Sequence, residues 1–547
     1  MTATPTPEPT FNLADLFETV ADAVPDRPAL VAGPVRLTYR ELDERATRFA
    51  ALLGARLAPG ERMTIWARNR AEWVEAMLGA FKSRTVPVNL NYRYTPGEAA
   101  HVLADSASRL VVVERVDLPS LAQVVGDLPE LRTVVVLEDG TPPVEHPALA
   151  GHEVLAAEPA LAEAGAAARG PRSSDDLYVL YTGGTTGAPK GVVWRHEDIF
   201  FAALATAGKA APDLRTPADV RDRALHRPAT CLPLAPLMHG NAQWNTLGPL
   251  LSGSTVVLWT GPFDAEEVWR LAALHGAKLL AIVGDAMALP LADALDADPG
   301  RAAGLAGLRV VASGGAIMSP GVKARLHRHL PECRLVDGFG ASETGVGGRM
   351  VDGTAAGRPR FVPGPGTAVL DAELRPTAPG SGLVGRLART GHIPLGYLND
   401  PEATARTFVT GPDGTRWALL GDDATVEADG TFTLLGRGSA VINTGGEKVH
   451  PEEVELALKA HPAVADALVV GLPDERFGEV VAAVVALRGR DAVDWDELRA
   501  QLRRDLSGYK VPRTFAVRDV LERSPAGKPD YRWALRQVEQ AREAERS

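Results

Sequence analysis

The chain has 547 residues, of which 45% are hydrophobic and 23% are charged, and its formal net charge at neutral pH is −11. This length predicts roughly two to four folding units. Basic residues are scattered along the sequence, which argues against nucleic acid or an anionic membrane surface as the main partner. The two cysteines, Cys231 and Cys333, have no metal-ligand spacing around them. A reducing compartment is therefore favoured over a disulfide-built secreted fold.

The first ten residues have neither the basic start nor the apolar stretch of a signal peptide. We expect a short disordered lead over 1–10. No uninterrupted apolar run reaches the roughly 20 residues that a membrane-spanning helix needs. The sequence therefore predicts a cytoplasmic protein without an integral membrane segment.

Short β-rich runs alternate with helical patterns over most of the chain. This alternation predicts an α/β fold with stacked layers and largely parallel sheets. The expected strands include 110–114, 133–137, 254–259 and 308–313, and the expected helices include 39–53 and 265–274.

Glycine-punctuated short strands replace this pattern from about Asp371 and predict a β-rich subdomain over about 365–437. A compact α+β pattern follows, in which Pro451 opens a helix whose first turn is rich in glutamate. Strands are expected at 467–471 and 480–487, and a further helix at 495–506. The sequence thus predicts a large N-terminal domain, 11–437, and a small C-terminal domain, 438–547.

The loop Tyr-Thr-Gly-Gly-Thr-Thr-Gly-Ala-Pro-Lys-Gly, residues 181–191, suggests phosphate binding but does not match the P-loop pattern. Its lysine follows Pro189, and Gly191 stands where the P-loop has its metal-binding hydroxyl. The hydroxyls of Thr182, Thr185 and Thr186 and the charge of Lys190 can still surround a polyphosphate. For this loop alone, a plain strand-to-strand turn is an equal alternative.

Three further motifs are equally ambiguous when each is taken alone. Residues 337–345, Asp-Gly-Phe-Gly-Ala-Ser-Glu-Thr-Gly, suit a flat ring and a hard cation. Asp422 and Arg437 suit a ribose, and Lys528 lies in a turn near the C-terminus. Tight turns and exposed charges would explain each of them without any ligand.

Taken together and in this order, the motifs resemble the adenylate-forming superfamily of acyl-CoA synthetases, luciferases and nonribosomal adenylation domains. The resemblance covers nearly the whole chain, from Leu37 through Pro236 to Lys528. Within the superfamily, the sequence is most similar to bacterial acyl-CoA synthetases for fatty acids and steroid side chains. That finer resemblance depends on residues 181–187, 194–198, 391–397 and 436–449.

The resemblance implies binding sites for ATP and Mg²⁺ and a catalytic set of Lys528, Glu343, Lys190 and His239. Glu343 would be the metal ligand, and adenine would lie between the backbone of residues 314–316 and the ring of Phe339. The implied nucleotide- and CoA-binding residues are Thr182, Gly183, Gly184, Thr185, Thr186, Gly187, Lys190, Gly314, Gly315, Ala316, Asp337, Gly338, Phe339, Gly340, Ser342, Asp422, Arg437, Gly445 and Gly446.

The resemblance also implies that the C-terminal domain is mobile. It would swing about a hinge near Arg437, after which Gly445 and Gly446 would line a tunnel for the pantetheine of coenzyme A. The implied acid pocket consists of His239, Asn241, Gln243, Trp244, Gly284, Asp285 and Met287. Gly240 replaces the aspartate that amino-acid-activating domains typically carry, which disfavours α-amino acids.

Five positions depart from the superfamily pattern. A serine is common at Gly183, an aspartate or lysine at Ser439 and a tyrosine at Phe339. Arg84 and Arg386 stand where glycine and glutamate are usual. All but the arginines recur in the subfamily that the sequence resembles, so we interpret them as variation within active enzymes.

The favoured function is an ATP-dependent carboxylic acid:CoA ligase that acts through an acyl-adenylate on a fatty, steroid-side-chain, aryl or other functionalised acid. The alternative is an adenylating enzyme whose acceptor is an amine, a carrier-protein thiol or a small nitrogen nucleophile. A nucleotide-binding scaffold without activity is disfavoured, because the lysines, acids and arginine of the motifs are all present. The expected partners are the acid, ATP and CoA; the oligomeric state stays open, and a homodimer is one alternative.

Overall fold

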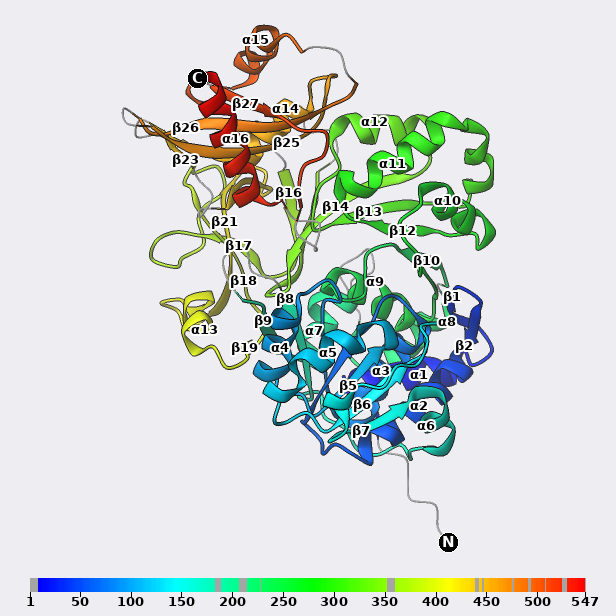
Figure 1. The fold of residues 1–547 in the computed structure, drawn as a ribbon. Helices are drawn as coiled ribbons and strands as arrows, with labels where there is room; N and C mark the ends of the chain where they lie inside the picture. Colours follow the sequence, from blue (N-terminus) through cyan, green and yellow to red (C-terminus); the bar gives the residue numbers. More distant parts are fainter. Residues whose placement is uncertain are drawn as a thin grey trace.

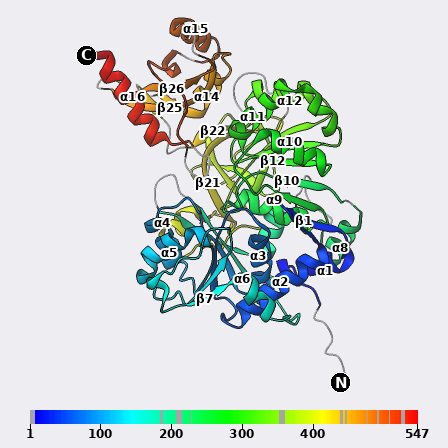
Figure 2. The ribbon, with the colours of Figure 1, turned by 45° about the vertical axis from the view of Figure 1, so that its right-hand side comes forward.

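A computed structural model describes residues 8–182, 188–205, 214–226, 228–351, 360–437, 442–444, 447–474, 477–489, 493–506, 508–523 and 529–546. Figures 1 and 2 show the N-terminal two thirds of the chain as two stacked α/β regions, with a smaller region above them. The predicted fold class is confirmed: the protein combines a large α/β part with a small α+β part. Within the described residues, no helix is both long enough and apolar enough to span a membrane.

The first sheet has the strand order β19-β9-β8-β4-β3-β5-β6-β7 among the described residues. Strands β3 to β8 run parallel, whereas β9 pairs antiparallel with β8 and β19 antiparallel with β9. The bounds are β3 (Arg62–Trp66), β4 (Val86–Asn89), β5 (Leu110–Glu114), β6 (Thr133–Leu137), β7 (Glu153–Ala156), β8 (Leu177–Thr182), β9 (Lys190–Arg195) and β19 (Gly396–Tyr397).

Helices cover both faces of this sheet, as parallel strands require. Alternate residues of β5 show this directly, because Leu110 and Val112 join one hydrophobic cluster and Val111 and Val113 another. Helices α1 (Leu13–Ala23), α2 (Tyr39–Gly54), α3 (Ala71–Ser83) and α6 (Ala157–Glu163) contribute to the first cluster. Helices α4 (Pro96–Asp105) and α5 (Leu118–Val124) contribute to the second.

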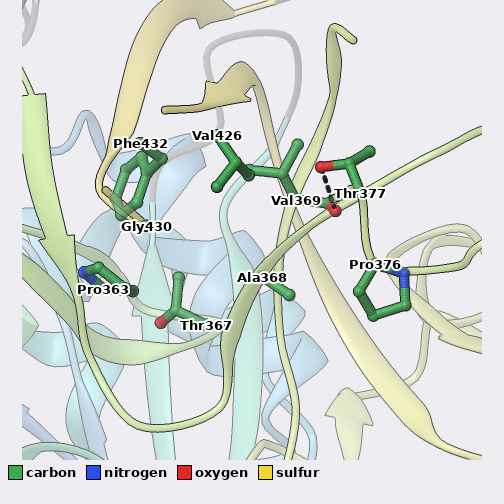
Figure 3. Close-up of a pocket in the computed structure, with 9 residues that line it drawn as sticks. All are labelled: Pro363, Thr367, Ala368, Val369, Pro376, Thr377, Val426, Gly430 and Phe432. Carbon is green, nitrogen blue, oxygen red and sulfur yellow. Dashed lines mark hydrogen bonds between the residues drawn. The ribbon is translucent and has the colours of Figure 1, made fainter. Parts of the chain in front are cut away.

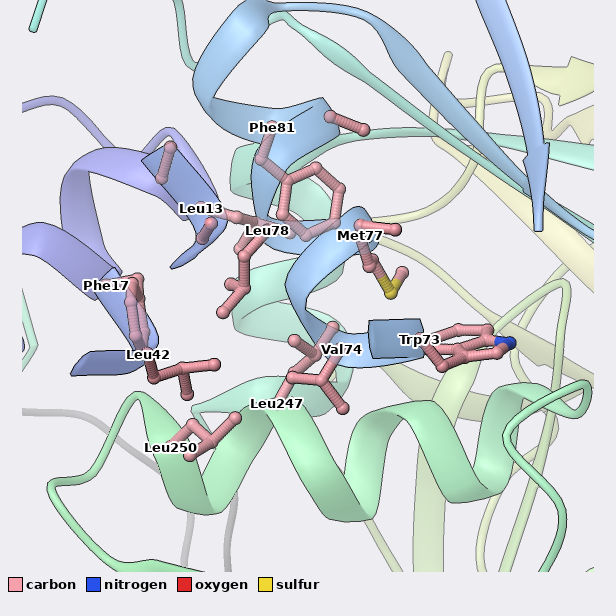
Figure 4. Packing of buried hydrophobic residues seen from close by; sticks show 14 of the residues in the cluster. Leu13, Phe17, Leu42, Trp73, Val74, Met77, Leu78, Phe81, Leu247 and Leu250 are labelled. Atoms are coloured by element: carbon pink, nitrogen blue, oxygen red, sulfur yellow. The ribbon is translucent and has the colours of Figure 1, made fainter. Parts of the chain in front are cut away.

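Helix α2 illustrates how local sequence sets an element. Thr38 and Glu41 form a reciprocal capping box at its start, which satisfies two backbone N–H groups. Its apolar face, predicted from the spacing of Leu42, Ala46 and Phe49, is fully buried. Figure 4 shows α3 packed between α1, α2 and α9 (Gly240–Leu250) through Trp73, Val74, Met77, Leu78 and Phe81.

The second sheet begins as a parallel sheet and continues as an antiparallel one. Its parallel part contains β1 (Pro28–Ala32), β10 (Thr230–Pro233), β11 (Thr255–Leu258), β12 (Leu279–Ile282), β13 (Val310–Gly314) and β14 (Arg334–Ala341), and β2 (Val35–Thr38) pairs antiparallel with β1 at its edge. Helices α10 (Ala265–Leu274), α11 (Gly284–Ala297) and α12 (Pro320–His329) pack on this sheet. Helix α8 (Pro217–His226) instead contributes Val220 and Ala224 to the first hydrophobic cluster. Helices α10 to α12 bury a common cluster against the strands.

An antiparallel extension of this second sheet contains the residues, about 365–437, for which the sequence predicts a β-rich subdomain. It consists of β15 (Gly345–Met350), β16 (Arg360–Pro363), β17 (Thr367–Leu370), β18 (Gly385–Arg389), β20 (Phe408–Thr410), β21 (Arg416–Val426) and β22 (Phe432–Arg437). The short helix α13 (Pro401–Thr407) precedes β20. The expected boundary near residue 365 stays a prediction, because hydrogen bonds between β14, β15 and β16 join the two parts continuously.

The C-terminal part is a sheet with helices on both faces. Its strands are β23 (Ile442–Thr444), β24 (Glu447–Val449), β25 (Val464–Asp474), β26 (Gly478–Leu487) and β27 (Thr514–Val517). Helices α14 (Pro451–Lys459) and α15 (Trp495–Asp505) cover one face, and α16 (Tyr531–Arg546) covers the other. The predicted helix starts at Pro451 and Trp495 are confirmed.

Candidate active site

The antiparallel pair β8 and β9 carries the predicted phosphate loop. Thr182 ends β8 and pairs with Lys190, which begins β9. The loop residues Gly183, Gly184, Thr185, Thr186 and Gly187 lie outside the described residues. The two strand ends nevertheless fix where the loop begins and where it ends.

Helix α4 supports both ends of this loop. The hydroxyl of Tyr181 donates to Asp105 Oδ2 at 2.5 Å, and His101 Nε2 donates to the carbonyl oxygen of Pro189 at 3.0 Å. Asn399 also donates to the carbonyl oxygen of Asp105, at 2.7 Å. The loop is therefore anchored on a helix that is about 80 residues earlier in the sequence.

Lys190 and Glu343 both contact Tyr397, Lys190 at the ring and Glu343 at the hydroxyl group. The ammonium of Lys190 lies 2.7 Å from Asp400 Oδ2 and 5.5 Å from the centre of the Tyr397 ring. The hydroxyl of Tyr397 donates to Glu343 Oε1 at 2.9 Å. The structure thus brings together the predicted phosphate-binding lysine and the predicted metal ligand, through a residue that was not predicted.

The turn that carries Glu343 is held by buried donors. Trp194 Nε1 donates to the carbonyl oxygen of Ser342 at 2.9 Å. Arg389, which is 4% exposed, donates through Nη1 to the carbonyl oxygens of Thr344 and Val346 at 2.5 and 2.7 Å. Burial lowers the pKa of Arg389 to about 10. A buried cation therefore lies directly behind the Glu343 turn.

Strands β13 and β14 place the predicted adenine-binding segments side by side. Gly314 pairs with Gly338, and Gly315 has a φ of +89°, a backbone conformation that favours glycine. The Phe339 ring lies 5.3 Å from the ring of Phe361 and 5.1 Å from that of Phe432, near edge-on to both. These contacts fix the position of the ring. Adenine stacking on Phe339 stays a prediction, as do the roles of Ala316, Gly340 and Ser342.

Asp337 is already engaged within the protein. It is 1% exposed, its Oδ2 forms an ion pair with Lys323, and its Oδ1 accepts from the backbone N–H of Met318 at 2.8 Å. Burial raises the pKa of Asp337, and the charge of Lys323 opposes that shift. In this conformation the carboxylate supports the loop around Met318, so its implied role in nucleotide binding would have to be combined with these contacts.

The two predicted ribose-binding residues are neighbours. Asp422 on β21 pairs directly with Arg437 on β22. Directly opposed residues of an antiparallel pair lie about 5 Å apart at Cα. Their predicted joint contact with one ribose is therefore compatible with the backbone, although the sheet register does not test it.

The predicted acid pocket begins where α9 begins. His239 precedes the first turn of α9, and Asn241 Nδ2 donates to the carbonyl oxygen of Gly314 at 3.3 Å. Asn89 connects this end to the phosphate loop, because its Nδ2 donates to the carbonyl oxygens of Met238 and Tyr181. The start of the predicted acid pocket and strand β8, which leads into the phosphate loop, are therefore both bonded to the buried amide of Asn89.

Two polar residues of the predicted pocket bond elsewhere in the protein. Gln243 is 1% exposed; its Oε1 accepts from the Tyr178 hydroxyl at 2.5 Å and its Nε2 donates to the carbonyl oxygen of Leu237 at 2.9 Å. Asp285 Oδ1 accepts from the backbone N–H of Ser319 at 2.8 Å. We interpret both as supports of the pocket wall.

The three other residues of the predicted pocket lie on two helices: Trp244 on α9, and Gly284 and Met287 on α11. Gly284 opens α11 with a φ of +51°, and a Cβ there would lie 2.6 Å from the Cβ of Ala316. The close approach therefore requires glycine. Trp244 and Met287 are partly buried and pack against the first and the second hydrophobic clusters, respectively.

Two family matches together cover most of the chain. The family described as AMP-binding enzyme matches residues 17–398, and the family described as AMP-binding enzyme C-terminal domain matches residues 453–528. The first match alone spans more than half of the 547 residues. This chain belongs to the AMP-binding enzyme family. The predicted membership in the adenylate-forming superfamily is confirmed.

Full-length relatives narrow the class of enzyme. A 3-oxocholest-4-en-26-oate–CoA ligase of Rhodococcus rhodochrous is 45% identical, with 96% of each chain covered. A medium/long-chain-fatty-acid–CoA/3-oxocholest-4-en-26-oate–CoA ligase of Mycolicibacterium smegmatis is 44% identical over 96% of each chain. The prediction of an AMP-forming acid–thiol ligase is confirmed at the level of enzyme class.

A solved structure shows that the fold is shared. The crystal structure of an anthranilate CoA ligase in complex with anthranoyl-AMP superposes on this AMP-binding enzyme with a TM-score of 0.82, covering 100% of both chains. The sequence identity of that pair is 23%, so the likeness is one of fold.

Several residues that position this site were missed by the sequence reasoning. Their own motifs are weak, because Asn89 and Asp105 end ordinary secondary-structure elements and Arg389 lies in a short strand. The family resemblance depends in part on residues 391–397, but it implies no role for Tyr397. The missed residues are Asn89, His101, Asp105, Lys323, Arg389, Tyr397, Asn399 and Asp400. One sequence feature could have indicated a functional residue, namely a charged side chain in a turn after a strand, and of these residues Asp400 has it.

The donor set around Glu343 fits a magnesium ion that is shared with phosphates. In the described part of the chain, no group of three or more histidine, cysteine, aspartate or glutamate side chains is arranged to hold a metal. Mg²⁺ usually takes one or two protein carboxylates and completes its shell with waters and substrate phosphates. A single carboxylate whose tyrosine partner also contacts the lysine of a phosphate loop matches that pattern.

A separate cavity of about 160 Å³ opens in the antiparallel part of the second sheet. Figure 3 shows it between Phe432, Val426 and Val369, with Thr377 bonded to the carbonyl oxygen of Val369. None of its lining residues is a predicted site residue. The remaining predicted residues Gly445, Gly446 and Lys528, and the hinge residue Ser439, lie outside the described residues.

Proposed function

We propose that this enzyme activates a carboxylic acid with ATP as an acyl-adenylate and transfers the acyl group to the thiol of coenzyme A, releasing AMP and pyrophosphate. The observation that carries the proposal is that Lys190 and Glu343 both contact Tyr397, at the end of the β8–β9 pair. We infer that Lys190 and Glu343 lie where the leaving pyrophosphate would be held, Lys190 as a cation and Glu343 as the ligand of a metal ion. ATP and coenzyme A are cytoplasmic co-substrates, and we expect the enzyme to work there.

In the first step, an oxygen of the acid attacks the α-phosphorus of ATP, and the bond between that phosphorus and the bridging oxygen to the β-phosphate breaks. Negative charge then accumulates on the pyrophosphate. Lys190 and the hydroxyl of Thr182 would bind the outer phosphates, and Mg²⁺ held by Glu343 would supply additional positive charge there. Buried Arg389, behind the Glu343 turn, adds to the same positive field.

In the second step, the thiol attacks the acyl carbon, a thioester forms, and AMP leaves with the carboxylate oxygen that was bonded to phosphorus. We propose that the C-terminal domain, 438–547, reorients between the steps. Lys528 would reach the reacting carboxylate in the first step, and the segment containing Gly445 and Gly446 would guide the pantetheine in the second. Separate domain positions let one small site serve two nucleophiles.

The acid that we propose is a medium- or long-chain fatty acid or a steroid acid with a carboxylated side chain. The two relatives are named for such acids, and they align with this enzyme over nearly its full length. The wall formed by Asn241 and Asn245 is polar; Asn245 Nδ2 donates to Asn241 Oδ1 at 2.8 Å. A steroid acid with an oxygen function would use that polarity better than a plain alkyl chain.

An acid panel tests the proposal. Purified enzyme is incubated with ATP, Mg²⁺ and octanoate, palmitate, 3-oxocholest-4-en-26-oate or benzoate, with and without coenzyme A. AMP, pyrophosphate and thioester are then quantified. We expect AMP and thioester in equal amounts with the fatty or steroid acids. The absence of AMP with every acid would refute an adenylating enzyme, and AMP without thioester would point to another acceptor.

A further inference from the structure

Residues 397–400, Tyr-Leu-Asn-Asp, form a turn between β19 and α13 that contacts both charged groups of the phosphate end. We call this segment the 397–400 turn. Its two ends have different chemistry, an aromatic ring with a hydroxyl and a carboxylate. Of the two charged groups, Tyr397 contacts both Lys190 and Glu343, whereas Asp400 forms an ion pair with Lys190.

The turn is a rigid platform. Tyr397 pairs with Val192 of β9, and the N–H of Leu398 donates to the carbonyl oxygen of Gly191 at 2.7 Å. Asn399 has a φ of +53° and is tied to Asp105 of α4. Two elements, β9 and α4, therefore fix the backbone of the turn relative to the strand from which Lys190 projects.

Asp400 has two partners, of which one is structural. As the N-cap of α13 it accepts from the N–H of Ala403 at 2.8 Å through Oδ1, which leaves Oδ2 for Lys190. The hydrogen bond from Lys190 is the main cause that lowers the pKa of Asp400, so the carboxylate is ionised at neutral pH. The negative charge of Asp400 therefore occupies the ammonium group of Lys190, which would otherwise be available to phosphate.

Tyr397, at the other end of the turn, contacts the second charged group, Glu343. Its hydroxyl donates to Glu343 Oε1 at 2.9 Å. A donated hydrogen bond fixes the orientation of a carboxylate and leaves its second oxygen for another partner. The ring face meanwhile lies within the range of a cation–π contact with Lys190.

Resting on the proposed function, we infer that the 397–400 turn positions the phosphate end in two opposing ways. Asp400 holds Lys190 away from phosphate until ATP displaces it, and Tyr397 orients Glu343 toward the metal. ATP binding therefore includes the exchange of one anion for another on Lys190. The two residues are positioning residues, because each acts through a neighbour and neither contacts the reacting atoms.

The test is calorimetric binding of the ATP analogue α,β-methylene-ATP, which needs no acid and no turnover. Asp400→Asn keeps a good N-cap but removes the charge. We expect about threefold tighter binding, the scale of one partly exposed ion pair. The matched control is Glu402→Gln, since Glu402 is an exposed acid on α13 that forms a long ion pair with Arg406, at 3.6 Å. It should leave the affinity unchanged.

A double-mutant cycle separates the ion pair from general charge effects. Combined with Lys190→Ala, the Asp400→Asn change should lose most of its effect. Unchanged or weaker binding by Asp400→Asn alone, or an equal gain with Lys190 absent, would overturn the role of Asp400. An equal gain from Glu402→Gln would do the same.

Tyr397→Phe tests the second half. It keeps the ring beneath Lys190 and removes the donor to Glu343, so the Mg²⁺ concentration for half-maximal analogue binding should rise about tenfold. Binding at saturating Mg²⁺ and the thermal midpoint should stay close to those of the wild type. An unchanged Mg²⁺ dependence would overturn this role. If the acid panel fails while these shifts are seen, the proposed function is wrong and the positioning role stands.

Discussion

The phosphate end and the acid end of the site are built differently. At the phosphate end, charged groups from distant segments face one another: Lys190, Asp400 and, through Tyr397, Glu343. At the acid end, the polar groups of Gln243 and Asp285 bond to their own surroundings. The first arrangement suits a ligand whose charge never varies. We propose that the second provides a wall whose shape, more than its charge, selects the acid.

This comparison predicts a simple division. A change at the phosphate end should reduce adenylation of every acid by the same factor, because all acids share the same ATP. A change at the acid end should instead alter the ratio between acids and leave the KM for ATP unchanged. Four substitutions test this division, from the largest expected effect to the smallest.

Lys528→Ala removes the lysine that we propose to contact the reacting carboxylate, where the two ends would meet. We expect adenylation to fall by about a thousandfold or more, since a preorganised charge at the reacting atoms is removed. Thioester formation from a supplied acyl-adenylate should be largely spared. Single-turnover assays of each half-reaction measure this, with Lys278→Ala, a change at an exposed lysine, as the control. An equal loss in both half-reactions would contradict the proposed reorientation of the C-terminal domain.

Glu343→Gln removes the proposed metal ligand and keeps its size. We expect a loss of about a hundredfold in adenylation at low Mg²⁺, the same for every acid, with partial recovery as Mg²⁺ is raised. Rates measured across a Mg²⁺ titration with two different acids give the answer. The same Mg²⁺ requirement as in the wild type would remove Glu343 from the metal site.

Asn241→Ala changes the wall of the acid pocket. The amide that contacts Gly314 and Asn245 is lost, and space opens beside β13. The ratio of kcat/KM between a steroid acid and octanoate should change by about tenfold, the scale of one polar contact in a binding pocket. The KM for ATP should not change. A uniform loss for all acids would break the distinction between the two ends.

Gln243→Leu tests the interpretation that Gln243 is structural. The Tyr178 hydroxyl and the Leu237 carbonyl each lose a buried partner, at about 1–3 kcal/mol for each unsatisfied group. The thermal midpoint should therefore fall by several degrees, while the ratio between acids stays the same. A shifted acid preference at an unchanged midpoint would return Gln243 to the pocket surface.

The sequence predicts the repeating parts of the fold well, because they follow from local patterns. The valine-rich runs at 110–114 and 133–137 are β5 and β6, and Tyr39 begins α2 as expected. The continuity of the antiparallel strands with the parallel sheet could not be predicted, since it depends on hydrogen bonds between distant segments.

The site shows the same limit. Motif order indicated Lys190 and Glu343, but their bridge, Tyr397, is set by the pairing of β19 with β9. The engagement of Asp337 by Lys323 and of Gln243 by Tyr178 likewise depends on tertiary packing. Sequence reasoning named residue types suited to the chemistry, whereas their partners required coordinates.

The central claim is that ATP is cleaved at the α-phosphorus by an acid before any thiol is needed. Exchange of labelled pyrophosphate into ATP tests it most directly, with 3-oxocholest-4-en-26-oate or octanoate and without coenzyme A. We expect the label to be incorporated into ATP. This incorporation should depend on the acid and on Mg²⁺, and it should be lost in Glu343→Gln at low Mg²⁺. Exchange that requires coenzyme A, or ADP as the product, would contradict it.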